Sequence, residues 1–275
     1  MQFFYYFCTL IIQKFHKTEI FLTMLREERL QFILKKLEKQ QRVFSVELSE
    51  ELQVSDDTIR RDLNELAEAG KLKKVHGGAV PVIPKAPAPL KLTERISYAQ
   101  AEKEIIMHKA LALFKDGQTV ILDNGSTNML IASNLPQSLN ATIFTNSLPI
   151  AQILCAYPNI ELVFVGGKIF KNAQVAEGAA TVQALSKIRA DFCIVGVCSI
   201  HPTIGVTTPY WEEGLVKQKM VEVSERVIAT AWRDKFNTAE TCWVCDYETL
   251  DLLITDSSLS PSQRADYEGK GVEIW

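Results

Sequence analysis

The chain has 275 residues, of which 47% are hydrophobic and 23% are charged, so it can bury a sizeable core and we expect two domains. Its net charge is −3, so contact with an anionic polymer such as nucleic acid needs a local basic patch. This argues against a protein that coats nucleic acid with its whole surface. The six cysteines are scattered along the chain, which favours a reducing, cytoplasmic location over secretion.

Residues 1–23 are interpreted as an N-terminal extension of uncertain status. The opening "MQFFYYFCTLIIQKF" has an apolar run shorter than the roughly 18 residues that span a bilayer, and no basic residue precedes it as in a secretory signal. One interpretation is a segment that binds a membrane surface. We favour a native start at Met24, because an amphipathic helix begins directly after it, and the mass of the native protein distinguishes the two.

Residues 24–80 predict a small domain of three helices and a β-ribbon. Apolar residues recur every three to four positions over 26–39, which indicates a helix with one buried face. Ser45 is expected to cap a second helix over 46–52, and Ser55 to cap a third that ends at a glycine. Two short helices joined by a tight turn form a helix-turn-helix, whose second helix enters the major groove of DNA.

The third helix predicts a polar face turned away from the core. Its apolar residues, at helical spacing, face inward, and the outward face carries Asp57, Thr58, Arg60, Arg61 and Asn64. At the helix start, the hydroxyl groups of Ser55 and Thr58 can reach a phosphate or a base edge. An arginine fork can bind guanine or phosphate, which suits base reading and backbone contact alike. The alternative is a solvated face on which the two arginines pair with nearby acids such as Asp57 and Glu65.

The stretch "GKLKKVHGGAV" predicts a short two-stranded ribbon that turns near Gly77 and Gly78. Its basic residues can reach a phosphate or the minor groove; they are Lys71, Lys73, Lys74 and His76. The helices and ribbon together predict a winged helix-turn-helix.

These residues resemble a known family. "VSDDTIRRDLNELAEAGKLKKVHGGAV" is similar to the DNA-binding head of DeoR-family bacterial transcription regulators, over about 55 residues, with Lys74 where the family often has arginine. The resemblance implies a sequence-specific regulator that binds an operator in double-stranded DNA. A homo-oligomer is also expected, because paired heads can read half-sites about 34 Å apart.

Residues 81–92 hold four prolines in "PVIPKAPAPLKL" and predict an extended linker to a second domain over 93–275. That domain reads as an α/β fold with a mostly parallel sheet, because a helical pattern over 101–114 is followed by short continuous apolar runs. The predicted strands are Thr119–Leu122, Thr142–Thr145, Glu161–Val165, Phe192–Val197, Val227–Ala231 and Leu252–Ile254.

Small polar residues follow the first three of these strands, in "LDNGSTNML", "FTNSLPIA" and "FVGGKIF". Because ligands on parallel sheets bind beyond the strands' carboxyl ends, these loops predict a phosphate-accepting rim; ordinary turn chemistry is the alternative. Neither G-x-G-x-x-G nor a Walker motif is present, and the single C-x-x-C at Cys242–Cys245 lacks a second ligand pair. We therefore expect no cofactor and no metal.

The second domain also resembles the DeoR family, in its effector-binding half, which is similar in fold to ribose-5-phosphate isomerase and glucosamine-6-phosphate deaminase. The matching motifs are D-x-G-[ST]-T, T-N-[SN], G-G and E-x-x-x-[KR]. The resemblance implies a sugar-phosphate site formed by Asp123, Gly125, Ser126, Thr127, Asn146, Ser147, Gly166, Gly167, Glu213, Lys217 and Lys235. One departure is Trp232, where the family's D-x-S-K-F has an acid, so the ligand can differ from a simple hexose phosphate.

The favoured function is a transcriptional repressor of carbohydrate metabolism genes that a phosphorylated sugar controls, and not an enzyme. The alternative is a sugar-phosphate isomerase or deaminase with an appended DNA-binding head, for which Asp123, Glu212 and Glu213 are candidate general bases. A third interpretation is an interaction module that uses the aromatic N-terminal segment at a membrane, although no membrane contact is expected for the regulator.

Overall fold

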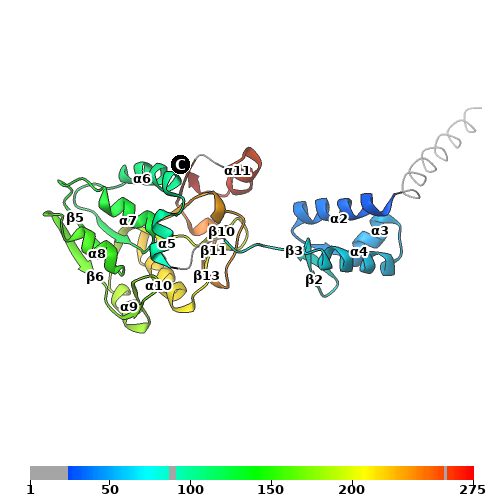
Figure 1. Cartoon of the computed structure of the whole chain (residues 1–275), viewed down its shortest axis with the longest axis horizontal. Coiled ribbons are helices and arrows are strands. Elements are labelled where there is room, and N and C mark those ends of the chain that lie inside the picture. Colours follow the sequence, from blue (N-terminus) through cyan, green and yellow to red (C-terminus); the bar gives the residue numbers. More distant parts are fainter. Residues whose placement is uncertain (1–23, 87–90, 257–258) are drawn as a thin grey trace, which may run out of the picture. The chain divides into compact units, whose positions relative to one another are not determined.

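The computed structural model describes residues 24–86, 91–256 and 259–275. The chain divides into two compact units between Ile83 and Pro84 (Figure 1). Both interpretations of residues 1–23 lie outside the described residues. Within the described ranges, no helix is both long enough and apolar enough to cross a membrane.

The first unit has the helices and the ribbon that the sequence predicts, plus one short strand that it does not. Its elements are α2 (Arg26–Gln40), β1 (Val43–Phe44), α3 (Ser45–Leu52), α4 (Asp56–Glu68), β2 (Leu72–Val75) and β3 (Gly78–Pro81). The strands form an antiparallel sheet in the order β1-β3-β2, so the extra strand β1 joins the ribbon to the helices.

The expected cap at Ser45 is wrong. Ser45 is the first residue of α3, Phe44 takes the N-cap position, and no side chain caps the helix. The reason is β1: pairing with β3 keeps Phe44 extended, and the amide of Ser45 donates to the carbonyl of Gly77 at 2.8 Å. The expected cap at Ser55 is present, since its hydroxyl accepts from the amide of Thr58 at 3.2 Å.

The core of the first unit joins the inner faces of its three helices. Ile33, Leu48 and Ile59 are fully buried, one from each helix. Beside this core, Arg29 holds the buried carboxylate of Asp62 with two bonds of 2.5 and 3.0 Å, which fixes α4 against α2.

Gly78 begins β3 at a crowded point. A Cβ atom there would lie 1.9 Å from the carbonyl oxygen of Val43, so only glycine lets β3 approach β1. The neighbouring Gly77 has a φ of 78°, in the left-handed region, and open space around it.

The second unit contains a seven-stranded sheet in which every pairing is parallel, as the continuous apolar runs predict. Its order is β15-β14-β12-β9-β4-β5-β6. The strands are β4 (Thr119–Leu122), β5 (Ala141–Thr145), β6 (Ile160–Phe164), β9 (Ala190–Gly196), β12 (Ser224–Ala231), β14 (Leu252–Thr255) and β15 (Glu273–Ile274). The six predicted strands are present, β4 with the predicted ends and the other five with shifted ends; β15 was not predicted.

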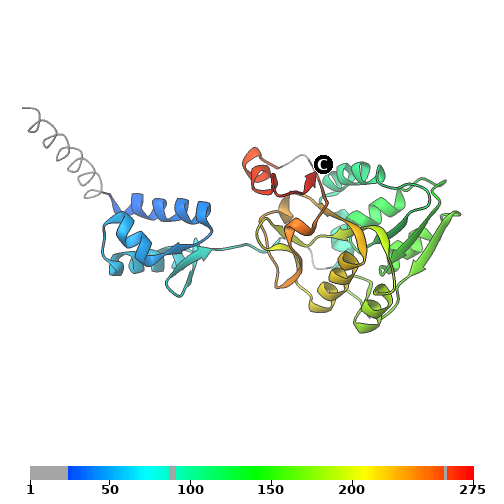
Figure 2. The ribbon, with the colours of Figure 1, turned by 180° about the vertical axis from the view of Figure 1, so that it is seen from behind.

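Helices cover both faces of this sheet (Figures 1 and 2). In β4, Val120 and Leu122 belong to one hydrophobic cluster and Ile121 to the other, so successive side chains enter opposite layers. The first layer contains α6 (Gln100–Leu111), α7 (Ser126–Ser133) and α8 (Leu148–Leu154), and the second contains α9 (Ala179–Leu185), α10 (Trp211–Glu222) and α11 (Pro261–Tyr267).

Smaller elements complete the unit. They are the helix α5 (Leu92–Ser97), the hairpin β7 (Lys168–Phe170) and β8 (Val175–Glu177), the sheet β10 (Ser199–His201), β11 (Gly205–Thr208) and β13 (Cys242–Cys245), and two 3-10 turns, Arg233–Lys235 and Tyr247–Thr249. The sequence patterns did not predict these strands, because each is short and lacks a periodic apolar run.

The strand order reverses between β4 and β9. From β4 the chain continues outward through β5 and β6, whereas β9 leads to β12, β14 and β15 on the other side. The loops that leave these two strands diverge, which opens a crevice beyond their carboxyl ends.

Candidate DNA-binding surface and effector pocket

Helix α4 presents its two arginines outward. The side chain of Arg60 is 68% exposed and that of Arg61 is 80% exposed, so neither is locked into the core. Each also pairs with an acid one turn earlier: Arg60 with Asp56 at 3.1 Å and Arg61 with Asp57 at 2.7 Å. Because exposed pairs at this spacing are weak, the arginines can exchange these partners for phosphates or bases.

The other residues expected on this surface lie at the start of α4 and on the ribbon. Ser55, Asp57, Asn64, Lys71, Lys73, Lys74 and His76 are exposed, and Thr58 is half-buried. The ammonium of Lys74 donates to the side-chain oxygen of Asn64, which ties the ribbon to the outer face of α4. Of the ribbon residues, Lys74 therefore lies beside the outer face of α4.

Replacing Asp57 with asparagine is expected to raise the affinity for DNA of random sequence by about 1.5- to 5-fold at low salt. Arg61 loses its partner within the helix, and the surface loses a charge that repels phosphate. Fluorescence anisotropy with a random duplex measures the change. Glu38→Gln, the same charge change at an exposed position of α2, is the control, and an equal gain there would contradict the expectation.

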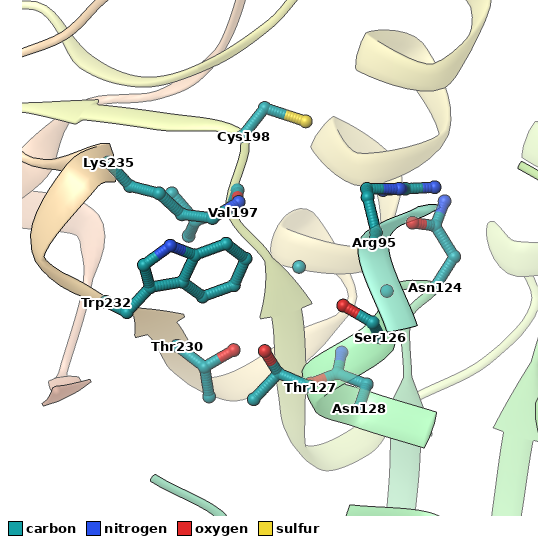
Figure 3. A pocket seen from close by; sticks show the side chains of 12 residues that line it. Arg95, Asn124, Ser126, Thr127, Asn128, Val197, Cys198, Thr230, Trp232 and Lys235 are labelled. Carbon is teal, nitrogen blue, oxygen red and sulfur yellow. The ribbon is translucent and has the colours of Figure 1, made fainter. Parts of the chain in front are cut away.

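In the second unit a pocket lies in the crevice between β4 and β9 (Figure 3). Four segments meet there: the start of α7, the residues after β9, the end of β12 with its following turn, and α5. They contribute Arg95, Asn124, Gly125, Ser126, Thr127, Asn128, Gly196, Val197, Cys198, Thr230, Trp232 and Lys235. A Cβ atom on Gly196 would lie 2.2 Å from the carbonyl oxygen of Asn124, so glycine is needed for this approach.

The lining of this pocket is rich in hydrogen-bond donors. The first turn of α7 begins after Gly125, and the first amides of a helix have no acceptor within it. Ser126 and Thr127 add hydroxyl groups. The Nε atom of Arg95 is buried and has no hydrogen-bond partner in the described part of the chain. Such a lining favours an anion.

Lys235 adds a buried ammonium group to the pocket. It donates to the carbonyl of Val197 and lies 4.0 Å from the centre of the Trp232 ring. Burial lowers the pKa of Lys235 to about 8, so the group is charged below that pH and loses its charge as the pH rises through it. A bound anion would favour the charged form.

Behind the pocket lies a buried cluster of three charges. Lys217 donates to Asp123 and to the carbonyl of Gly196 at 2.9 Å, and lies 3.4 Å from Glu213. Glu213 also accepts from Thr208 at 2.7 Å.

The charges in this cluster shift one another's pKa. Burial raises the pKa of Asp123, and the nearby Lys217 only partly offsets it. For Glu213, burial acts in the same direction, but Lys217 and two hydrogen bonds outweigh it and hold the pKa below its usual value. Burial would lower the pKa of Lys217, yet the two carboxylates raise it above its usual value. The cluster joins α10 to the ends of β4 and β9.

Comparison with known proteins identifies both units. Residues 29–83 match the DeoR-like helix-turn-helix domain and residues 98–257 match the DeoR C terminal sensor domain. The chain belongs to the DeoR family of transcriptional regulators. It is 33% identical to the HTH-type transcriptional repressor GlcR of Bacillus subtilis over 85% of this chain and 89% of that protein. It is 31% identical to the HTH-type transcriptional regulator GolR of Listeria innocua, over 90% and 97%.

A solved structure aligns with part of the chain. Ribose 5-phosphate isomerase A from Methanocaldococcus jannaschii aligns with 49% of this chain and 53% of its own at 17% identity, with a TM-score of 0.35.

The structure brings only some of the expected effector residues to the pocket of this DeoR-family regulator. Gly125, Ser126, Thr127 and Lys235 line it. Asp123, Glu213 and Lys217 form the charge cluster behind it.

The remaining four residues, Asn146, Ser147, Gly166 and Gly167, do not line this pocket. Ser147 caps α8, and the carbonyl of Gly166 accepts from Thr181. Gly167 lies so close to Thr181 that a Cβ atom would be 2.1 Å from its hydroxyl. Local structure therefore involves Ser147 and Gly167 directly, and Gly166 through its backbone.

Several pocket residues were missed from the sequence. Asn124 and Asn128 lie within the quoted "LDNGSTNML", where their polar side chains were a signal. Arg95, Cys198 and Thr230 belong to no motif, and only the folding of distant segments brings them together.

The three candidate bases of the enzyme alternative are each paired with a lysine. Asp123 and Glu213 are held by Lys217, and the exposed Glu212 pairs with Lys168 at 2.7 Å. In the described residues no group of His, Cys, Asp and Glu could hold a metal ion. The relatives are DNA-binding regulators, and this chain is one as well, not an enzyme.

Proposed function

We propose that the protein is a cytoplasmic repressor of carbohydrate metabolism genes that binds an operator as a homo-oligomer and is controlled by a phosphorylated sugar. The observation that carries the proposal is the donor-rich pocket at the strand-order reversal of the sensor domain, in a chain that also carries outward arginines on a recognition helix. In this proposal residues 24–80 bind DNA, residues 81–92 connect, and residues 93–275 sense the metabolite.

The relatives' names support the regulatory part. They include the glycerol-3-phosphate regulon repressor of Escherichia coli, 29% identical over 85% of this chain, and a putative aga operon transcriptional repressor, 28% identical over 90%. Several relatives are thus repressors, and one name refers to a phosphorylated compound.

In the DNA-binding unit, we assign Arg60 and Arg61 to bases and phosphates in the major groove. The basic residues of the ribbon then lie against neighbouring phosphates. In the sensor unit, the phosphate group binds the first turn of α7 together with Lys235 and Arg95, because these groups combine amide donors with positive charge. The charge cluster of Asp123, Glu213 and Lys217 holds the pocket's walls in place.

A DNA-binding assay with and without sugar phosphates tests this function. Anisotropy with the DNA upstream of the protein's own gene should show binding well above that to random DNA at moderate salt. One or more of glycerol 3-phosphate, ribose 5-phosphate and glucose 6-phosphate should change that affinity, and linkage requires the DNA to change the compound's affinity by the same factor. Equal affinity for random DNA would contradict the regulatory function, and no response to the compounds would contradict the proposed effector class.

A further inference from the structure

A larger chamber adjoins the pocket. It holds about 260 Å³, against about 20 Å³ for the pocket itself, and the two share Arg95, Cys198 and Lys235. A cavity of about 20 Å³ admits little more than one water molecule. The body of a ligand whose anionic group lies against Lys235 therefore has to extend into the chamber.

Glu240 contributes a carboxylate to this chamber that lacks a hydrogen bond. Its side chain is only 9% exposed, and its Oε2 atom has no hydrogen-bond partner in the described part of the chain. The nearest cation is the ammonium of Lys85, 3.5 Å from that atom, which is beyond ordinary hydrogen-bond length. A buried acceptor without a donor is costly, so this oxygen points to a ligand that supplies one.

Lys85 reaches the chamber from the segment that leaves the DNA-binding unit. It lies two residues after the boundary between Ile83 and Pro84, and it lines the chamber together with Ala86. The amide of Ala239 donates to the carbonyl of Pro84 at 3.0 Å, so this segment is attached directly beside Glu240.

The same part of the chain contributes a second wall. Arg95, in α5, lines both cavities. The ammonium of Lys103 donates to the carbonyls of Arg95 and Tyr98, which fixes the end of α5, and the amide of Leu92 donates to Asn172 at 3.1 Å. Residues before and after the end of the predicted linker therefore line the space that a ligand would occupy.

We propose that Lys85 and Glu240 bind the hydroxyl groups of the effector's sugar body, and that Lys85 thereby couples the effector to the segment leading to the DNA-binding unit. This inference rests on the proposed function and adds the residues that select the ligand's body. A hydroxyl group both accepts and donates, so one placed between the two side chains accepts from the ammonium of Lys85 and donates to Oε2 of Glu240. Inorganic phosphate lacks such a body and gains nothing from the pair.

Glu240→Gln tests the recognition. Isothermal titration of the full-length protein with inorganic phosphate, glycerol 3-phosphate, ribose 5-phosphate and glucose 6-phosphate gives an affinity for each. The sugar or polyol phosphate that binds the wild type most tightly should bind the variant about 10- to 150-fold more weakly, because hydrogen bonds to charged groups are among the stronger ones. Affinity for inorganic phosphate should stay within about twofold, which shows that the pocket is intact.

Glu225→Gln is the matched control, since Glu225 is exposed and does not line the chamber. Unchanged affinity of Glu240→Gln for the preferred compound would overturn the inference while leaving the proposed function standing. If none of the organic phosphates binds the wild type, both the inference and the proposed effector class are overturned. An equal loss for inorganic phosphate also overturns the inference, because the pair would then act on the anion.

Lys85→Ala tests the coupling. Saturating concentrations of the preferred compound change the affinity for operator DNA by a certain factor in the wild type. The logarithm of the same factor, measured for Lys85→Ala, should be less than half as large. Lys187→Ala, an exposed lysine of the sensor unit, should respond like the wild type. A full response of Lys85→Ala would overturn the coupling.

Discussion

Replacing Arg61 with alanine is expected to weaken binding to operator DNA by about 5- to 150-fold, which is about 1–3 kcal/mol. The side chain is 80% exposed on the recognition helix and pairs with Asp57, so it is available to DNA and its loss leaves the core untouched. Anisotropy at several salt concentrations measures the effect. A phosphate contact would also flatten the slope of log affinity against log salt by about 0.9, whereas a base contact would relax sequence preference.

Lys39→Ala is the control for that experiment. Lys39 is an exposed basic residue of α2 in the same unit, so its removal changes the net charge equally without altering α4. An equal loss of affinity in Lys39→Ala would mean that overall charge, and not the recognition helix, binds the DNA. Unchanged affinity in Arg61→Ala would remove Arg61 from the interface.

Replacing Lys217 with methionine is expected to destabilise the sensor unit by about 3–5 kcal/mol. Lys217 is fully buried between two carboxylates, and without it Asp123 and Glu213 remain buried with no cation of their own cluster. Urea unfolding followed by fluorescence measures the free energy. Lys219→Met, on the same helix with a surface partner, should cost about 0–1 kcal/mol.

The loss of unfolding free energy caused by Lys217→Met should depend on pH. Without the cation, burial raises the pKa of both carboxyl groups above that in the unfolded chain. A folded-state pKa above the unfolded value contributes stability at low pH that is lost as the pH rises through the folded-state pKa. The variant should therefore lie closer to the wild type at about pH 5 than at about pH 8. A deficit independent of pH would show that lost packing, not buried charge, causes it.

Long periodic segments were predictable from the sequence. The apolar spacing of the three helices in the first unit and the continuous apolar runs of the central strands reflect burial on one face or on both, so residue type alone indicates them. Family motifs indicated the recognition helix and the loop that begins α7. These are local features, in which neighbouring residues carry the whole signal.

What was missed depends on distant contacts. Ser45 has the side chain of a good cap, but β1 pairs with β3 and fixes the backbone before it. Gly167 is a glycine because Thr181 lies against it, a reason invisible in the loop itself. Arg95 and Glu240 line cavities because α5 and the β11–β13 region fold beside the ends of β9 and β12.

The adjacent glycines Gly77 and Gly78 occur together for unrelated reasons. At Gly77 the requirement is a left-handed backbone conformation, which asparagine also adopts. A Cβ atom at this position would meet open space, so a side chain fits there. At Gly78 the requirement is the absence of any side chain at all, because a carbonyl group occupies the volume that a methyl would need. The two adjacent glycines therefore meet different structural requirements. A substitution that is tolerated at Gly77 would, at Gly78, separate β3 from β1.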